Sequence, residues 1–194
     1  TGKISQKKLL FEKQHLERLQ KASRYFAFPF DAEDLRQKIE EECQACDLHQ
    51  DYRLRISLSK FGEIKIERQI LTPLSSSFCQ AKLCLQEADL QQAFTYFKST
   101  HRPHLTMGEN EIIYHTVDGK LLETSIGNLV LKMNGKLYTP PSQLGLLPGI
   151  YRQHLLESGQ VEEKILTIAD LKRAEVIYGC NAVRGLYELS VKEN

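Results

Sequence analysis

The chain of 194 residues is long enough for one large domain or two small ones. Its 26 basic and 25 acidic residues leave a formal charge of +1, which argues against a nucleic acid as the main partner. Its apolar runs are only a few residues long and no basic, apolar leader opens it, so we expect neither a membrane segment nor secretion.

Two amphipathic helices are predicted first. Apolar residues at spacings of three and four predict a helix from about Leu9 to Phe26, which Pro29 ends. Asp31 is expected to cap a second helix, whose inward face carries Leu35, Ile39 and Cys43. Cys43 and Cys46 form a lone C-x-x-C, for which we favour packing on this inner face over a redox or zinc site. The five cysteines together predict reduced thiols in a cytoplasmic protein.

A hairpin is predicted next, because apolar and polar residues alternate on both sides of Phe61-Gly62. The alternating apolar residues are Leu54, Ile56, Leu58, Ile64 and Ile66. Lys82 to Glu87 are compatible with another short strand. The segment Leu90 to Phe97 has no clear period and is expected to link two halves. We therefore place two domains at residues 1–92 and 93–194.

The second half is predicted to be mostly β structure. Asp118-Gly119 marks a turn, and Asn134-Gly135 is the strongest short hairpin signal in the chain. One helix is expected to begin at Pro148-Gly149 and to run to about Ser158. The predicted strands are Glu111 to Val117, Asn128 to Met133, Lys136 to Thr139, Glu162 to Leu166, Glu175 to Gly179 and Leu186 to Val191.

Lys98 is the sharpest candidate for chemistry. It lies in Tyr96-Phe97-Lys98-Ser99-Thr100, between aromatic residues and hydroxyls. A lysine amine reacts as a nucleophile only when deprotonated, so it needs a desolvated site or a nearby cation such as Arg102. Without such surroundings, a solvated surface lysine is the more common explanation.

Four further positions are weak signals when taken singly. Glu123 follows the Asp118-Gly119 turn, and its ordinary explanation is an exposed acid. Gly149, at a predicted helix start, lets backbone N–H groups approach an anion. Asn181-Ala182 follows a strand and offers an amide and more N–H groups, although a plain turn is commoner. Arg18 has the planar donor fork that matches a phosphate, but helix arginines usually face water. The scattered histidines predict no metal site.

Six segments occur in a characteristic order. His15-Leu16-Glu17-Arg18-Leu19 fits H-x-x-R-L, and Phe97 to Arg102 is close to a lysine segment K-T-T-x-R. Asp118-Gly119 and then Leu122 to Leu129 resemble D-G-x-x-x-E-x-S-x-x-N-[IL]-F. Tyr138 to Pro141, Gly145 to Arg152 and Asn181 to Leu186 follow. In this order they resemble the fold-type IV enzymes that use pyridoxal 5'-phosphate (PLP), the class IV aminotransferase superfamily, and most of all aminodeoxychorismate lyase.

The resemblance implies a role for each matched residue. Lys98 would be the Schiff-base and proton-transfer lysine, and Glu123 would pair with the pyridinium nitrogen of PLP. Asn128 would shape the cofactor loop. The residues implied to hold the cofactor phosphate are Arg18, Gly149, Ile150, Asn181 and Ala182.

The resemblance also implies an α+β fold like that of D-amino acid aminotransferase. A small N-terminal α/β domain would precede a larger, β-rich pseudo-barrel domain, with PLP between them. The family's usual first strand, with its F-x-x-x-E-T-like stretch, is not visible, so we expect the small domain to lack it. The family implies a cytoplasmic homodimer that acts on a small amino substrate.

Within the superfamily, Gly145 to Ile150 and Asn181 to Leu186 look most like the lyase, especially the form fused to aminodeoxychorismate synthase component I. The implied reaction releases pyruvate from 4-amino-4-deoxychorismate and gives 4-aminobenzoate for folate biosynthesis. An aminotransferase of the branched-chain or D-amino acid type and a catalytically reduced homologue stay open, because cofactor-contacting residues do not separate them.

Overall fold

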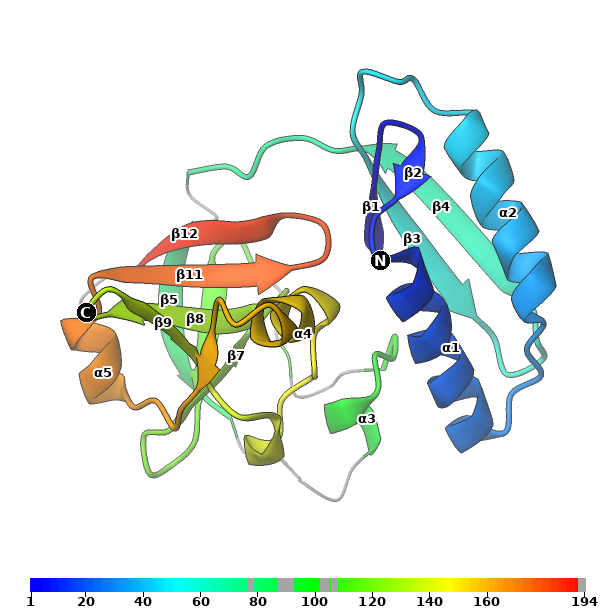
Figure 1. The fold of residues 1–194 in the computed structure, drawn as a ribbon. Helices are drawn as coiled ribbons and strands as arrows, with labels where there is room; N and C mark the ends of the chain where they lie inside the picture. The colour runs from blue at the N-terminus through cyan, green and yellow to red at the C-terminus, as the bar shows by residue number, and fades with distance from the viewer. Residues whose placement is uncertain (77–78, 87–92, 102–104, 106–107, 192–194) are drawn as a thin grey trace. The chain divides into compact units, whose positions relative to one another are not determined.

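A computed structural model describes residues 1–76, 79–86, 93–101, 105 and 108–191 of the chain. The chain divides into two compact units, Thr1–Pro73 and Leu74–Asn194, and each has its own apolar core. The predicted α+β class, with a small α/β domain followed by a larger β-rich one, is confirmed (Figure 1). The division falls earlier than the predicted one, because strand β5 (Gln80–Leu85) pairs with strands of the second unit.

The first unit packs two helices against a four-stranded antiparallel sheet with the strand order β2-β1-β3-β4. Its elements are β1 (Gly2–Ser5), β2 (Lys8–Leu9), α1 (Glu12–Phe26), α2 (Ala32–Gln44), β3 (Tyr52–Leu58) and β4 (Ile64–Ile70). Asp31 caps α2 as predicted, because its carboxylate accepts from the N–H groups of Glu33 at 2.8 Å and Asp34 at 3.1 Å. Cys43 and Cys46 are buried in this core, which confirms their predicted packing.

A strand precedes α1 in the unit that was expected to lack its usual first strand. β1 pairs with β3, and Ile4 on β1 is fully buried. At four residues, this strand is too short to show a clear alternation of apolar and polar residues in the sequence. For the same reason β2, with two residues, gave no signal.

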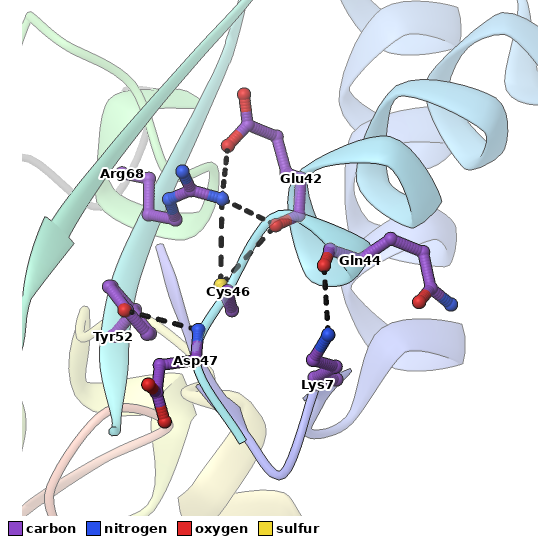
Figure 2. Close-up of polar contacts among 7 residues, drawn as sticks. All are labelled: Lys7, Glu42, Gln44, Cys46, Asp47, Tyr52 and Arg68. Carbon is purple, nitrogen blue, oxygen red and sulfur yellow. Dashed lines mark hydrogen bonds and ion pairs between the residues drawn. The ribbon is translucent and has the colours of Figure 1, made fainter. Parts of the chain in front are cut away.

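Two cationic side chains from other parts of the chain cap the C-terminal end of α2 (Figure 2). The last turn of α2 contains no basic residue. Lys7, in the β1–β2 turn, donates to the Gln44 carbonyl at 3.1 Å, and Arg68 of β4 donates to the Glu42 carbonyl at 2.6 Å. Arg68 also pairs with the Glu42 carboxylate at 3.2 Å. Cations at this position satisfy free carbonyls and oppose the helix dipole, so these contacts tie α2 to the sheet.

The second unit is built around a closed ring of strands (Figure 1). Its eight-stranded sheet has the order β10-β9-β8-β11-β12-β5-β6-β7, and an additional β7–β8 pairing joins the ends of six strands into a ring. Apolar side chains fill the ring, as a small barrel requires. The predicted pseudo-barrel is therefore confirmed. Besides β5, its elements are α3 (Ala93–Tyr96), β6 (Glu111–His115), β7 (Leu121–Thr124), β8 (Asn128–Met133), β9 (Lys136–Thr139), the 3-10 turn Ser142–Leu144, α4 (Ile150–Glu157), β10 (Glu162–Glu163), α5 (Ile168–Arg173), β11 (Val176–Asn181) and β12 (Gly185–Val191).

Most predicted elements of the second unit are present with shifted ends. The predicted Asn134-Gly135 hairpin turn is confirmed, and both residues have positive φ, 50° and 74°. The strand predicted at Glu162 to Leu166 shrinks to two residues, and α5 follows it unpredicted. The predicted link from Leu90 contains α3, and its first residues lie outside the described part of the chain. None of the helices that the structure describes is long and apolar enough to cross a membrane.

Candidate functional site

Glu123 and Asn128 lie opposite each other on β7 and β8. They are the register pair of these antiparallel strands, so their side chains project to the same side. Both are buried, with exposed fractions of 2% for Glu123 and 3% for Asn128. The ordinary explanation of Glu123 as an exposed acid is therefore wrong. A carboxyl group withdrawn from water in this way is hydrogen-bonded, paired with a cation or neutral.

Asn128 also fixes the approach to helix α4. Its Nδ2 donates to the Leu147 carbonyl at 2.8 Å, and its Oδ1 lies 2.0 Å from the point that a Cβ on Gly149 would occupy. Gly149 is the N-cap of α4 and provides no side chain to cap the helix. Only glycine lets the start of α4 pack this closely against β8, the strand that carries Asn128. A helix start of this kind favours the binding of an anion.

The β11–β12 turn lies beside both of these segments. Asn181 Oδ1 accepts from the N–H groups of Val183 and Arg184, each at 2.9 Å, and Nδ2 donates to the Ile126 carbonyl at 3.4 Å. A Cβ on Gly185, in the same turn, would lie 3.3 Å from the hydroxyl oxygen of Tyr151 in the first turn of α4. The structure therefore brings together three predicted cofactor segments that are distant in sequence: Glu123 with Asn128, Gly149 with Ile150, and Asn181 with Ala182.

The other two predicted residues are Lys98 and Arg18. Lys98 lies two residues after α3, and its side chain is exposed. Arg102, the cation expected near it, lies outside the described residues. Arg18 lies half-buried on α1 of the first unit. The roles of both residues stay predictions.

Glu111, on β6, is a buried polar residue outside the motifs of the sequence. Its side chain is fully buried, and one carboxylate oxygen, Oε1, accepts from Ile126 N at 3.2 Å and from Ser125 Oγ at 3.3 Å. Burial raises the pKa of the Glu111 carboxyl, against the opposing effect of its hydrogen bonds. The alternation of Glu111 with Ile113 on a predicted strand was the available signal, because it places both on the inward face.

Arg152, in the first turn of α4, is also buried and was not selected. Its exposed fraction is 2%, its Nη2 donates to the Pro140 carbonyl at 2.8 Å, and it forms an ion pair with Glu163. These contacts fasten α4 to the segment around β9 and β10. Nothing in the local sequence distinguishes Arg152 from a solvated helix arginine, because both of its partners come from other elements.

Comparison with known proteins identifies the family. The family model for amino-transferase class IV matches residues 1–190. A Schizosaccharomyces pombe protein provisionally named an aminodeoxychorismate lyase is 23% identical over 186 residues, which cover 88% of this chain and 79% of that protein. A Haemophilus influenzae protein described as uncharacterized is 36% identical over 69 residues, and the match spans only 36% of each chain.

Solved structures share the fold. One, provisionally named an amino-acid aminotransferase of Mesorhizobium loti, has a TM-score of 0.81 and 24% identity, covering 98% of this chain and 97% of that one. The PLP-bound form of a hypothetical aminotransferase of Mycobacterium tuberculosis has a TM-score of 0.80 and 17% identity, covering 98% of this chain and 79% of that one. The ordered segments, the ring of strands and the match over residues 1–190 together show that this chain belongs to the class IV aminotransferase family.

Proposed function

We propose that the chain binds PLP and acts as an aminodeoxychorismate lyase. The observation that carries the proposal is the meeting of Glu123, Asn128, the start of α4 and the Asn181 turn in one region of the second unit. Fold-type IV relatives with PLP bound share this fold. A homodimer in the cytoplasm, and fusion to a synthase component, belong to the same proposal and rest on the family resemblance.

The chemistry of these residues fits the two ends of PLP. The buried Glu123 carboxylate would hold a proton at the pyridine nitrogen, since a buried acid gains from a cationic partner. The N–H groups at Gly149 and Ile150 and the Asn181-Ala182 turn would bind the phosphate, which suits a helix start. The phosphate role of Arg18 rests on the family resemblance alone.

Lys98 would carry the proton transfer. When bound, PLP supplies an electron sink for the negative charge that forms at the substrate carbon. Lys98 would attach the cofactor covalently and, once released, its neutral amine would take the proton from the carbon that bears the substrate amine. In the lyase reaction, removal of this proton by Lys98 would be followed by cleavage of the bond between the ring carbon and the enolpyruvyl oxygen, which makes the ring aromatic. The released enolpyruvate would take up one proton and become pyruvate.

An aminotransferase is the second candidate, because the Mesorhizobium loti structure is covered over 97% of its length. The deciding assay supplies purified protein and PLP with 4-amino-4-deoxychorismate in one reaction and with glutamate and a branched-chain keto acid in another. The proposal predicts equimolar 4-aminobenzoate and pyruvate in the first, abolished in Lys98→Ala. Transfer of the amino group in the second, without release of 4-aminobenzoate, would overturn the lyase assignment. No turnover in either would favour a catalytically reduced homologue.

A further inference from the structure

The Glu111 carboxylate is bonded to the turn that joins the two strands of the candidate site. Its two donors on Oε1, Ile126 N and Ser125 Oγ, both belong to the segment that connects Glu123 on β7 with Asn128 on β8. The position of Glu111 at the start of β6 is set independently, because it pairs with Ala81 of β5. Glu111 therefore ties the β7–β8 turn to a neighbouring part of the ring.

The same turn is held from the other side by β11. Ile126 accepts from Asn181 Nδ2 through its carbonyl at 3.4 Å, while its N–H donates to Glu111. A Cβ on Gly127 would lie only 2.5 Å from the Cys180 carbonyl oxygen, so the backbones of the two segments are in close contact. One residue, Ile126, is thus fixed between Glu111 and Asn181 by its two backbone groups.

The Thr124 side chain also hydrogen-bonds the Glu111 carboxylate, and so does Tyr187 of β12. Its hydroxyl donates to Glu111 Oε2 at 3.4 Å. Its ring lies over Gly179, where a Cβ would come within 2.4 Å of the ring carbon Cζ. Removing a carboxylate from water is unfavourable, and an apolar residue of similar size would fill the space at less cost. An apolar residue, however, would not accept the hydrogen bonds that Glu111 receives from the turn and from Tyr187.

We propose that Glu111 is a positioning residue for the cofactor site. By holding Ile126, it sets the distance between the Glu123–Asn128 pair and the Asn181 turn. Glu123 is the group assigned to the pyridine nitrogen, and the Asn181 turn is assigned to the phosphate. It acts through the turn and touches no cofactor atom. This inference rests on the proposed function, and its test includes a measurement on the protein without PLP.

The test compares Glu111→Leu and Glu111→Gln with the wild type. The first measurement is hydrogen–deuterium exchange of the PLP-free protein over residues 125–128 and 181–184, and the second is the dissociation constant of PLP. Glu111→Leu removes the acceptor of Ile126 N, Ser125 Oγ and the Tyr187 hydroxyl. It should therefore speed exchange in both segments and weaken PLP binding by about tenfold. Glu111→Gln should restore most of both, because its amide oxygen accepts from Ile126 N and its NH2 donates to the Tyr187 oxygen.

Two further variants separate positioning from general destabilisation. Thr167→Ala removes the capping box of α5 and should lower stability without changing exchange in the two segments or PLP affinity. Tyr187→Phe keeps the ring and loses the hydroxyl that donates to Glu111 and bonds to the Thr124 side chain. It leaves the bonds from Glu111 to the turn in place, so it should give a smaller loss of affinity than Glu111→Leu. It also provides the test if Glu111→Leu does not fold.

The inference would be overturned if Glu111→Leu speeds exchange throughout the second unit and Thr167→Ala weakens PLP binding as much as Glu111→Leu does. If the wild type binds no PLP, the proposed function fails, and the exchange measurement alone decides whether Glu111 holds the two turns.

Discussion

Asn128 occupies the space in which any side chain at position 149 would begin. Its Oδ1 lies 2.0 Å from the ideal Cβ position of Gly149, and its Nδ2 donates to the Leu147 carbonyl two residues earlier. Gly149 has a φ of −66°, which every residue type tolerates. The requirement for glycine is therefore steric, and it sets how closely the start of α4 approaches β8.

Gly149→Ala should destabilise the protein by about 1–3 kcal/mol, because its Cβ displaces the Asn128 amide. It should also weaken PLP binding, and both effects are measurable by urea unfolding and cofactor titration. Gly108→Ala is the control, since the nearest atom to its Cβ among the described residues would be the Asn110 carbonyl oxygen at 4.0 Å. The double variant Asn128→Ala/Gly149→Ala should lose less than the sum of the single variants. Strictly additive losses would show that the two residues do not interfere.

Arg152→Met should lower the free energy of unfolding by about 1–3 kcal/mol, because it removes the buried donor to the Pro140 carbonyl and the ion-pair partner of Glu163, whose side chain is exposed. The matched control is Lys136→Met, which breaks the neighbouring ion pair with Glu162 on exposed side chains. That change should have little effect. Equal losses in the two variants, measured by urea unfolding, would contradict the structural role given to Arg152.

Arg68→Met should destabilise the first unit by about 1–2 kcal/mol, because α2 loses a cation and a donor at its C-terminal end. Arg36→Met, which breaks an exposed i,i+3 pair with Glu33 on the same helix, should cost no more than about 0.5 kcal/mol. Thermal unfolding of both variants, followed by circular dichroism, tests the difference. A loss in Arg36→Met as large as that in Arg68→Met would count against the capping account.

Asp170 should make stability depend on pH in acid. Burial alone raises the pKa of this carboxyl, but hydrogen bonds from Thr167 and the Arg173 ion pair outweigh it, so the pKa is lowered from 3.8. Because the folded-state pKa lies below the unfolded one, the contribution is present above 3.8 and is lost as the pH falls through the folded pKa. The wild type should therefore have a higher free energy of unfolding than Asp170→Asn near neutral pH. This difference should become smaller as the pH falls into the acid range. An unchanged difference across that range would contradict this assignment.

Local signals allowed part of the fold to be predicted from the sequence. Asn134-Gly135 has the residues that positive φ requires, and Pro148-Gly149 marks the start of α4. The capping box of Thr167 and Asp170 was equally readable and would have revealed α5. By contrast, β7 is buried at all four positions and shows no alternation, so neither the strand nor its closure of the ring onto β8 was predictable from local pattern.

The sequence allowed candidate site residues to be selected, but not their arrangement. The order of motifs selected Glu123, Asn128, Gly149 and Asn181, whereas their burial and mutual contacts depend on pairing between distant strands. Glu111 shows the limit most clearly. Its sequence context is an ordinary strand start, and its importance comes from donors on a turn 14 and 15 residues later and from Tyr187, 76 residues later.

The absorbance spectrum of the desalted protein after incubation with PLP tests the central proposal most directly. A covalent link between PLP and Lys98 predicts a band near the boundary of the visible and ultraviolet ranges that borohydride reduction removes. The band should persist in Lys82→Ala, which changes another exposed lysine of the second unit, and be absent in Lys98→Ala. A wild-type protein that stays colourless with added PLP would contradict the proposed cofactor, and a band that survives in Lys98→Ala would contradict the proposed lysine.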